Sequence, residues 1–440
     1  MAIQASVNEP VTPLTPGEYS GEVTRSLNGR WTFENKNARL RPGDVLHYWM
    51  FVQHERLGYR RDDEKVTIID LSSRSQNYDT NPTNTNNNNQ NCEPSLTTVK
   101  GIANVCKGQL IFEDNFVTKK LDDQKWHQDC HIPSYEEDNE YVSYQARPEN
   151  LIINNGRLSI WPTILKDNDY IQTGELNMTE ICGCRGTKLG ECYGKAMTFN
   201  ILQPVVSASV RSKFSFRYGK VQIRAKLPKG NWLYPLLNLE PLDYEYGPGY
   251  RSGKIRIAFA RGNDMLMNPN NGYDFGSKEM NAGLLLGQFK PPRNHSTRTY
   301  QEQNGGHWTS AFHTYEVVWT PSNLQVSVDG INFAVISPPP GGFKSVQDTS
   351  VPNFRRWDGD EMAPFDKQMV IRMALACGGV TDFPDNTVSG GNIGPPRPKP
   401  WRNLEPKAML SFWQDILAWE STWKPDGASL QVEFVKVWAL

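Results

Sequence analysis

The sequence predicts an all-β protein, because its clearest periodic segments alternate apolar and polar side chains with a period of two. Residues 221–227 (VQIRAKL) and 324–328 (LQVSV) both alternate in this way, which is typical of half-buried β-strands. The dipeptide Asp329-Gly330 then supplies a two-residue hairpin turn before the alternation resumes at Ile331. Long amphipathic helical stretches are hard to find, and many short strands with Gly- and Pro-rich connections favour a β-sandwich.

The length of the chain predicts more than one domain. A single hydrophobic core rarely supports 440 residues. An Asn- and Thr-rich tract at residues 72–91 holds almost no apolar side chain to bury, and it is expected to form a flexible tether. We therefore divide the chain into a small domain at 1–72, a linker at 73–97 and a large domain at 98–440.

Composition argues against several classes of function. The formal net charge is -1, with 47 basic and 48 acidic side chains and no basic stripe, so nucleic acid is not an expected partner. No apolar run approaches the length of a membrane span. No Walker loop, dinucleotide fingerprint or Gly-x-Ser-x-Gly elbow is present. The pair Cys182 and Cys184 lacks a second Cys or His pair at zinc-finger spacing, so we expect neither a metal nor a cofactor.

A set of short motifs runs through the large domain. They are GNWLYP at 230–235, RSG at 251–253, ARGN at 260–263, FHTYEVVWTP at 312–321 and the closing segment at 430–440. Together they resemble the strand and loop motifs of glycoside hydrolase family sixteen. In order and wording they look like the invertebrate β-1,3-glucan recognition proteins, also called Gram-negative-bacteria-binding proteins. The resemblance implies a concanavalin-like β-jelly-roll sandwich for residues 98–440.

The catalytic strand of that hydrolase family is altered in this chain. A laminarinase carries Glu-x-Asp-x-x-Glu there, and the same register places Lys254 at the nucleophile, Arg256 at the helper aspartate and Phe259 at the acid/base. A retaining glycosidase needs two carboxylates roughly 5 Å apart. An amine, a guanidinium and a phenyl ring cannot replace them, so we expect no glycosidase activity.

Two alternatives to this interpretation stay open. Lys254 and Arg256 could be no more than the solvated face of an alternating strand. Glu240, Asp243 and Glu245 precede that strand and could supply replacement carboxylates. They lie, however, in a segment rich in Pro and Gly, whereas a nucleophile has to be held rigidly.

The large domain is also expected to keep a sugar-sized groove. Trp232 and Tyr234 would form its walls beside Lys254 and Arg256, and the two cations would favour anionic or hydroxyl-rich ligands. The alternative for Trp232 is a position in the core.

The small domain carries its own motifs, NGRWTF at 28–33, GDVLHYW at 43–49 and LGYR at 57–60. They resemble the glucan-binding module of the same recognition proteins, which implies an immunoglobulin-like β-sandwich. Trp49 and Arg60 lie where that family places glucan-contacting residues, and Glu22 is a further candidate acceptor. An indole can stack on a pyranose and a guanidinium can donate to sugar hydroxyls.

Other positions for these side chains also stay open. Trp49 could belong to the core, because apolar residues crowd the same strand, and Arg60 could lie in an exposed turn of mixed charge. The match begins inside the module and no signal peptide is visible, so we expect an N-terminally truncated form of it.

The resemblance implies a secreted, non-catalytic pattern-recognition protein of innate immune defence. Its ligand would be β-1,3-glucan or a related microbial cell-wall polysaccharide, and a downstream immune serine protease would be a possible protein partner. The alternatives are a residual endo-β-1,3-glucanase and a truncated paralogue that acts only through protein contacts.

The seven cysteines suggest disulfides and at least one free thiol. Proximity in sequence favours the pairs Cys92 with Cys106 and Cys184 with Cys192, which leaves Cys130, Cys182 and Cys377. Cys377 lies in an apolar strand and is expected to be a buried free thiol. Asn177 and Asn294 begin glycosylation sequons.

Overall fold

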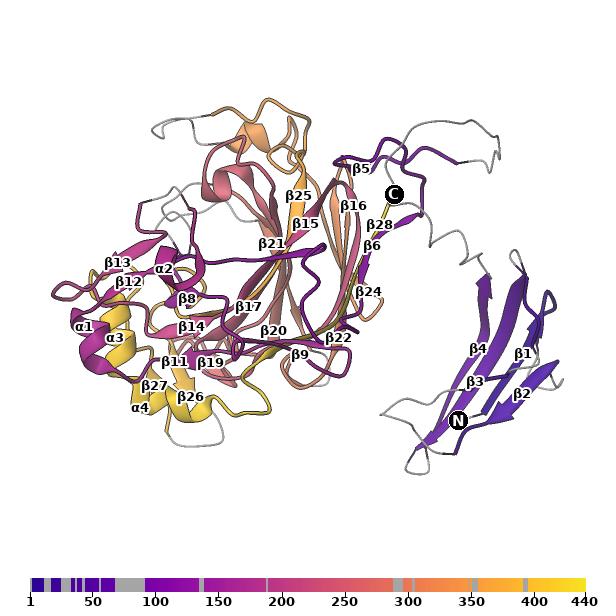
Figure 1. Cartoon of the computed structure of the whole chain (residues 1–440), viewed down its shortest axis with the longest axis horizontal. Helices are drawn as coiled ribbons and strands as arrows, with labels where there is room; N and C mark the ends of the chain where they lie inside the picture. The colour runs from indigo at the N-terminus through magenta and orange to yellow at the C-terminus, as the bar shows by residue number, and fades with distance from the viewer. Residues whose placement is uncertain are drawn as a thin grey trace. The chain divides into compact units, whose positions relative to one another are not determined.

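The chain divides into two compact units, Met1–Asn88 and Asn89–Leu440, and each is described by itself (Figure 1). The computed structural model describes residues 2–11, 17–24, 33–35, 38–41, 44–54, 57–67, 92–133, 138–186, 189–287, 296–302, 305–347, 349, 355–390 and 395–440.

The first unit contains one antiparallel sheet of four strands, in the order β2-β1-β3-β4. The strands are β1 (Ala2–Val7), β2 (Tyr19–Glu22), β3 (Val45–His54) and β4 (Leu57–Thr67). Phe33 covers one face of this sheet, since a Cβ added at Gly21 would lie 2.0 Å from its ring. All strands described for this unit belong to the one sheet, so a second layer of the predicted sandwich is not among the described residues.

The second unit is built on two large sheets, which we call the β18 sheet and the β16 sheet. The β18 sheet consists of β21 (Ser296–Gln301), β20 (Glu279–Leu285), β18 (Lys254–Phe259), β17 (Leu233–Pro241), β25 (Met369–Cys377), β15 (Ser209–Arg217) and β5 (Thr98–Val99), with β7 (Trp126–Gln128) also paired to β15. The β16 sheet consists of β24 (Ile331–Ile336), β23 (Leu324–Val328), β22 (His313–Trp319), β16 (Gly219–Lys226), β28 (Leu430–Trp438), β10 (Leu158–Ile160) and β9 (Leu151–Ile153), with β6 (Leu110–Asp114) paired to β28.

Shorter elements complete the unit (Figure 1). The small sheets contain β8 (Val142–Tyr144), β11 (Thr163–Ile164), β12 (Glu175–Asn177), β13 (Tyr193–Lys195), β14 (Val205–Ser207), β19 (Met265–Met267), β26 (Val388–Gly390) and β27 (Arg397–Pro398). The helices are α1 (Asn168–Thr173), α2 (Met178–Cys182), α3 (Ala408–Gln414) and α4 (Ile416–Trp419), with 3-10 turns at Gly249–Ser252, Phe343–Val346 and Glu420–Thr422. Within the described part of the chain, no helix has the length and apolar character needed to cross a bilayer.

The core of the second unit lies between the two large sheets. Val221, Ile223 and Ala225 of β16 are buried while the residues between them are not, as the alternation in the sequence predicts. Phe216 of β15 meets Trp319 of β22 with ring centroids 5.9 Å apart, so the two sheets pack face to face. The all-β prediction is confirmed.

The second unit makes ordered contacts from Cys92 onwards. Cys92 is bonded to Cys106, and the buried hydroxyl of Thr97 accepts a hydrogen bond from the Leu440 N–H at 2.9 Å. Residues 92–97, which the sequence analysis assigned to the linker, therefore contact this unit.

Candidate functional site

Strand β18, where the resemblance places the catalytic carboxylates of the hydrolase family, is buried along its whole length. Lys254, Arg256 and Phe259 are only 3%, 7% and 1% exposed. The alternative of a solvated cationic face is therefore excluded, and neither cation is exposed enough to line the open groove that the sequence had led us to expect. Their charges are matched inside the protein instead.

Lys254 is held by an acid from the neighbouring strand. Its Nζ lies 3.3 Å from Oε1 of Glu240, which also accepts a hydrogen bond from Arg372 Nη1 at 3.2 Å. Arg211 approaches the other oxygen of Glu240 at 3.9 Å. Glu240 was expected in a flexible segment rich in Pro and Gly, but it lies on β17, since that strand continues to Pro241 by pairing with β25.

Glu240 is a poor replacement nucleophile because three cations surround it. Burial alone would raise its pKa, but Arg372, Lys254 and Arg211 outweigh burial and hold the pKa of Glu240 well below its usual range. The carboxylate stays ionised and committed to these partners. Asp243 and Glu245, the other two candidates, are exposed beyond the end of β17.

Arg256 and Phe259 are fixed in a second cluster. Arg256 Nη2 donates to Oδ1 of Asp382 at 2.9 Å, and burial, which lowers the pKa of Arg256, is outweighed by Asp382. The same guanidinium lies 4.1 Å from the centroid of the Phe259 ring, and Arg261 lies 5.3 Å from it. A phenyl ring close to two guanidinium groups gains cation–π attraction but offers no group for proton transfer.

Trp232 and Tyr234 do not form the walls of an open groove beside Lys254 and Arg256, so this prediction is corrected; Trp232 instead lines a separate pocket of about 480 Å³. Both are buried, and each ring packs edge-on against the ring of Phe383. The ring centroids are 5.3 Å apart for Trp232 and 5.6 Å apart for Tyr234. The ring centroids of Trp232 and Trp401 are also 4.9 Å apart. Trp232 therefore lies in the core, which was the alternative position that the sequence left open. Neither ring is available to stack on a sugar.

The motif residues around Trp232 serve this packing. Trp232 has a positive φ of 70°, and its N–H donates to the side chain of Asn263 at 3.0 Å. Gly230 has a φ of 144°, and a Cβ there would lie 2.6 Å from the Trp423 ring. The GNW and RGN motifs therefore fix two adjoining loops, and Gly230 and Gly262 of these loops line one side of the pocket of about 480 Å³.

A row of charged and polar residues across the β18 sheet was not predicted from the sequence. Cα pairing places His127 opposite Arg211, Arg211 opposite Arg372, Arg372 opposite Asn238 and Asn238 opposite Arg256. Directly opposed residues share a face of a sheet, so these side chains line one face. One residue in the sequence could have indicated this row. Arg372 is the single charged residue in the otherwise apolar segment 369–377, and a buried cation requires a buried acid as its partner.

The candidate glucan-binding residues of the first unit come together on one face of its sheet. Glu22 is opposite Ala2, Ala2 is opposite Phe51, and Phe51 is opposite Arg60. Trp49 lies two residues before Phe51 on β3 and so shares this face. Glu22 is exposed and Trp49 is half-buried, while the side chain of Arg60 lies outside the described residues.

The opposite face of this sheet is the one that Phe33 covers. Gly21, Ile3 and Met50 are aligned across it, and Tyr48 is opposite the buried Ala5 on the same side. Trp49 therefore points away from the Phe33 side, and the face with Glu22 and Trp49 is the candidate carbohydrate surface.

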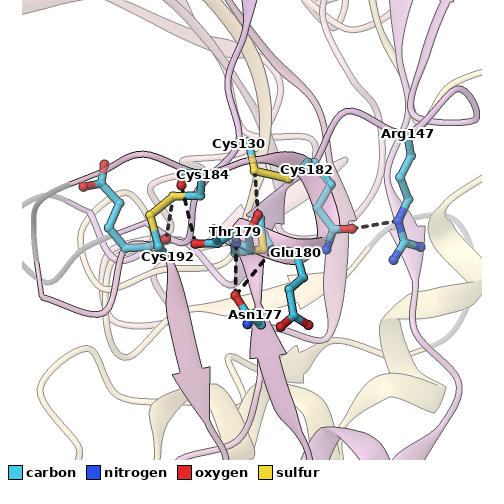
Figure 2. The surroundings of a disulfide bond; sticks show 12 residues. Cys130, Arg147, Asn177, Thr179, Glu180, Cys182, Cys184 and Cys192 are labelled. Atoms are coloured by element: carbon cyan, nitrogen blue, oxygen red, sulfur yellow. Dashed lines mark hydrogen bonds between the residues drawn. A yellow bond between two sulfur atoms is a disulfide. The ribbon is translucent and has the colours of Figure 1, made fainter.

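Both predicted disulfides, Cys92–Cys106 and Cys184–Cys192, are present, and Cys377 is a buried free thiol. A third bond joins Cys130 to Cys182, so two disulfides lie side by side around α2 (Figure 2). Asn177 caps α2 by accepting from the Thr179 N–H at 3.2 Å. Asn294 lies outside the described residues.

The site has no cluster suited to a metal ion. Over the described ranges, no group of three or more His, Cys, Asp or Glu side chains is arranged to hold one. The face with Glu22 and Trp49 offers an exposed acid and an indole, while the β18 strand offers only paired charges.

Family models match both units. Residues 1–92 match the model described as carbohydrate binding domain (family 32), and residues 290–369 match glycosyl hydrolases family 16. The structure of the laminarinase catalytic domain from Thermotoga maritima is similar with a TM-score of 0.47 and 18% identity, over 76% of this chain and 98% of that one.

Relatives of full length identify the family. The beta-1,3-glucan-binding protein of Tenebrio molitor is 35% identical over 100% of this chain and 90% of that protein. Gram-negative bacteria-binding protein 1 of Drosophila melanogaster is 31% identical over 97% of this chain and 87% of that protein. The chain belongs to the family of β-1,3-glucan-binding and Gram-negative bacteria-binding proteins, as its motifs predicted.

Proposed function

We propose that this chain is a non-catalytic pattern-recognition protein of innate immune defence that binds β-1,3-glucan or a related microbial polysaccharide. The buried pair of Lys254 and Glu240 carries the non-catalytic part of the proposal. By the resemblance, Lys254 stands where the hydrolase family carries its nucleophile and Phe259 where it carries the acid/base, and both residues are buried in this structure. The relatives that cover the whole chain are named as binding proteins.

The glucan contacts are assigned to the first unit. Glu22, Trp49 and Arg60 share one face of its sheet by register. An acid, an indole and a guanidinium can accept from hydroxyls, stack on a pyranose and donate to hydroxyls, respectively. The match of residues 1–92 to a carbohydrate-binding model supports this assignment.

Secretion and a protein partner complete the proposal. Three disulfides suit a protein that folds in an oxidising compartment. Bound glucan would then be reported to an immune serine protease, in keeping with the resemblance to the recognition family.

Retention on insoluble β-1,3-glucan tests the binding assignment. Trp49→Ala and Arg60→Ala should each weaken retention of the full chain, because loss of a stacked aromatic or a charge-assisted hydrogen bond costs about 1–3 kcal/mol of binding. The melting temperature of the first unit should stay close to that of the wild type.

Tyr48→Ala is the matched control for Trp49→Ala. Tyr48 is adjacent on β3 but shares the face of the buried Ala5, so its loss should lower stability and leave retention per folded molecule unchanged. If Trp49→Ala instead destabilises the unit by about 3–5 kcal/mol, as core truncations do, Trp49 is a core residue and the assignment fails.

A further inference from the structure

A polar pocket of about 270 Å³ lies beside the ion pairs of the second unit. Its floor is one end of the charged row, formed by His127 of β7, Arg211 of β15 and Arg372 of β25. Pockets for small organic ligands usually measure roughly 300–1,000 Å³, so this one has space for a single small ligand and not for an extended polymer.

One wall of the pocket is fixed by the paired disulfides. Arg185, Gly186 and Glu191 come from the loop that the Cys184–Cys192 bond closes. Cys130, which also lines the pocket, is bonded to Cys182 (Figure 2). The wall is therefore tied covalently in two places, which favours a pocket that is already formed before a ligand enters.

The acids around the pocket already have partners. Asp129 Oδ2 accepts from the Ser209 hydroxyl at 2.7 Å, and Asp129 lies 3.8 and 3.9 Å from Arg211 and Arg372. Burial raises the pKa of Asp129, but these two arginines outweigh it and the pKa is lowered. Glu140 and Glu191 each have an interaction of their own.

Two guanidinium N–H groups, in contrast, have no acceptor. Arg372 uses Nη1 on Glu240 and Nε on Ser209, but its buried Nη2 has no hydrogen-bond partner among the described residues. The buried Nε of Arg211 has none within the same part of the structure. A buried donor without an acceptor raises the free energy of the folded protein. A ligand that supplies oxygen acceptors to these N–H groups would therefore gain binding free energy.

The charged side chains of the pocket determine which acceptor group of a ligand fits best. Basic and acidic side chains are balanced in the pocket and directly beneath it: Arg185, Arg211, Arg372 and Lys254 against Asp129, Glu140, Glu191 and Glu240. A carboxylate matches the planar guanidinium best and forms charge-assisted bonds. A doubly charged phosphate would meet more repulsion from the acids.

From these observations we infer that the pocket is a second binding site, which takes a sugar-sized, polyhydroxylated ligand bearing one carboxylate. Arg211 and Arg372 bind the carboxylate, and the histidines and acids of the wall bind hydroxyl groups. The inference goes beyond the proposed function, because the first unit recognises a neutral glucan and this pocket recognises an acidic sugar.

Calorimetric titration of the full chain with glucuronate tests the inference, with glucose and inorganic phosphate as comparison probes. Saturable binding of glucuronate is expected, at least about tenfold tighter than that of glucose, because the carboxylate adds charge-assisted hydrogen bonds. Arg211→Gln should weaken glucuronate binding by about tenfold for the same reason.

Arg217→Gln is the matched control. Arg217 lies on the same strand and has a buried Nε without a partner in the described region, but it does not line the pocket. The Arg217→Gln variant should bind glucuronate as the wild type does. If Arg211→Gln lowers the melting temperature, Arg185→Gln is the alternative test variant. Arg185 lies at the exposed rim of the pocket, and its substitution should also weaken glucuronate binding.

Several results would overturn the inference. They are no saturable glucuronate binding, glucose or phosphate binding as tightly as glucuronate, or unchanged affinity in both the Arg211 and Arg185 variants. Retention of the same wild-type chain on insoluble glucan keeps the two proposals apart. A chain that binds glucuronate but is not retained on glucan contradicts only the proposed function. A chain that is retained on glucan but does not bind glucuronate contradicts only the acidic-sugar site.

Discussion

Glu240→Gln is expected to destabilise the second unit by about 3–5 kcal/mol, the usual cost of removing one partner from a buried ion pair. Glu240 is fully buried and lies within 4 Å of Lys254, Arg372 and Arg211. Without the charge of Glu240, Lys254 would lose this ion pair, and Arg211 and Arg372 would keep Asp129 at 3.8 and 3.9 Å. Denaturant unfolding of the full chain, followed by tryptophan fluorescence, measures the loss.

Glu245→Gln is the matched control for this substitution. Glu245 is close in sequence and also pairs with a cation, Lys367 at 3.3 Å, but about half of its side chain is exposed. Exposed ion pairs contribute less than about 1 kcal/mol, so this variant should unfold almost as the wild type does. Equal losses in the two variants would mean that the Glu240 network is not what stabilises this part of the sheet.

Lys254→Glu is expected to be at least as damaging, although by the resemblance it introduces the residue that a laminarinase carries at this position. The new carboxylate would face Glu240 across the 3.3 Å now spanned by an ion pair. Two buried like charges at this distance cannot both stay ionised without a large cost. We expect a loss of stability of about 3–5 kcal/mol and no release of sugar from laminarin.

Lys254→Met separates the charge reversal from the loss of the lysine. Methionine fills a similar volume without a charge, and Glu240 keeps its hydrogen bond to Arg372. The methionine variant should therefore be clearly more stable than the glutamate variant. A Lys254→Glu chain as stable as the wild type would contradict the closed, ion-paired strand described above.

The sequence predicted those parts of the fold that depend on neighbouring residues. The alternation at 221–227 became β16 with Val221 and Ile223 in the core, and Asp329-Gly330 became the turn between β23 and β24. The predicted cysteine pairs were 8 and 14 residues apart. The Cys130–Cys182 bond, which spans 52 residues, could not be deduced from proximity.

The errors arose where a partner distant in sequence decides burial. A half-exposed β18 was left open as an alternative by its alternating sequence, but all six of its residues are buried. Arg256 is buried because it meets Asp382, and Trp232 is buried because Phe383 and Trp401 enclose it. A local pattern shows that such a side chain is charged or aromatic. It does not show whether solvent, a ligand or a remote segment will cover it.

The assay for reducing ends released from laminarin tests the non-catalytic assignment most directly. The purified chain should release none above the blank, in a preparation that is retained on insoluble β-1,3-glucan, because Lys254 is paired with Glu240 and Phe259 offers no proton. Release that persists through purification and rises in proportion to the concentration of the chain would contradict it.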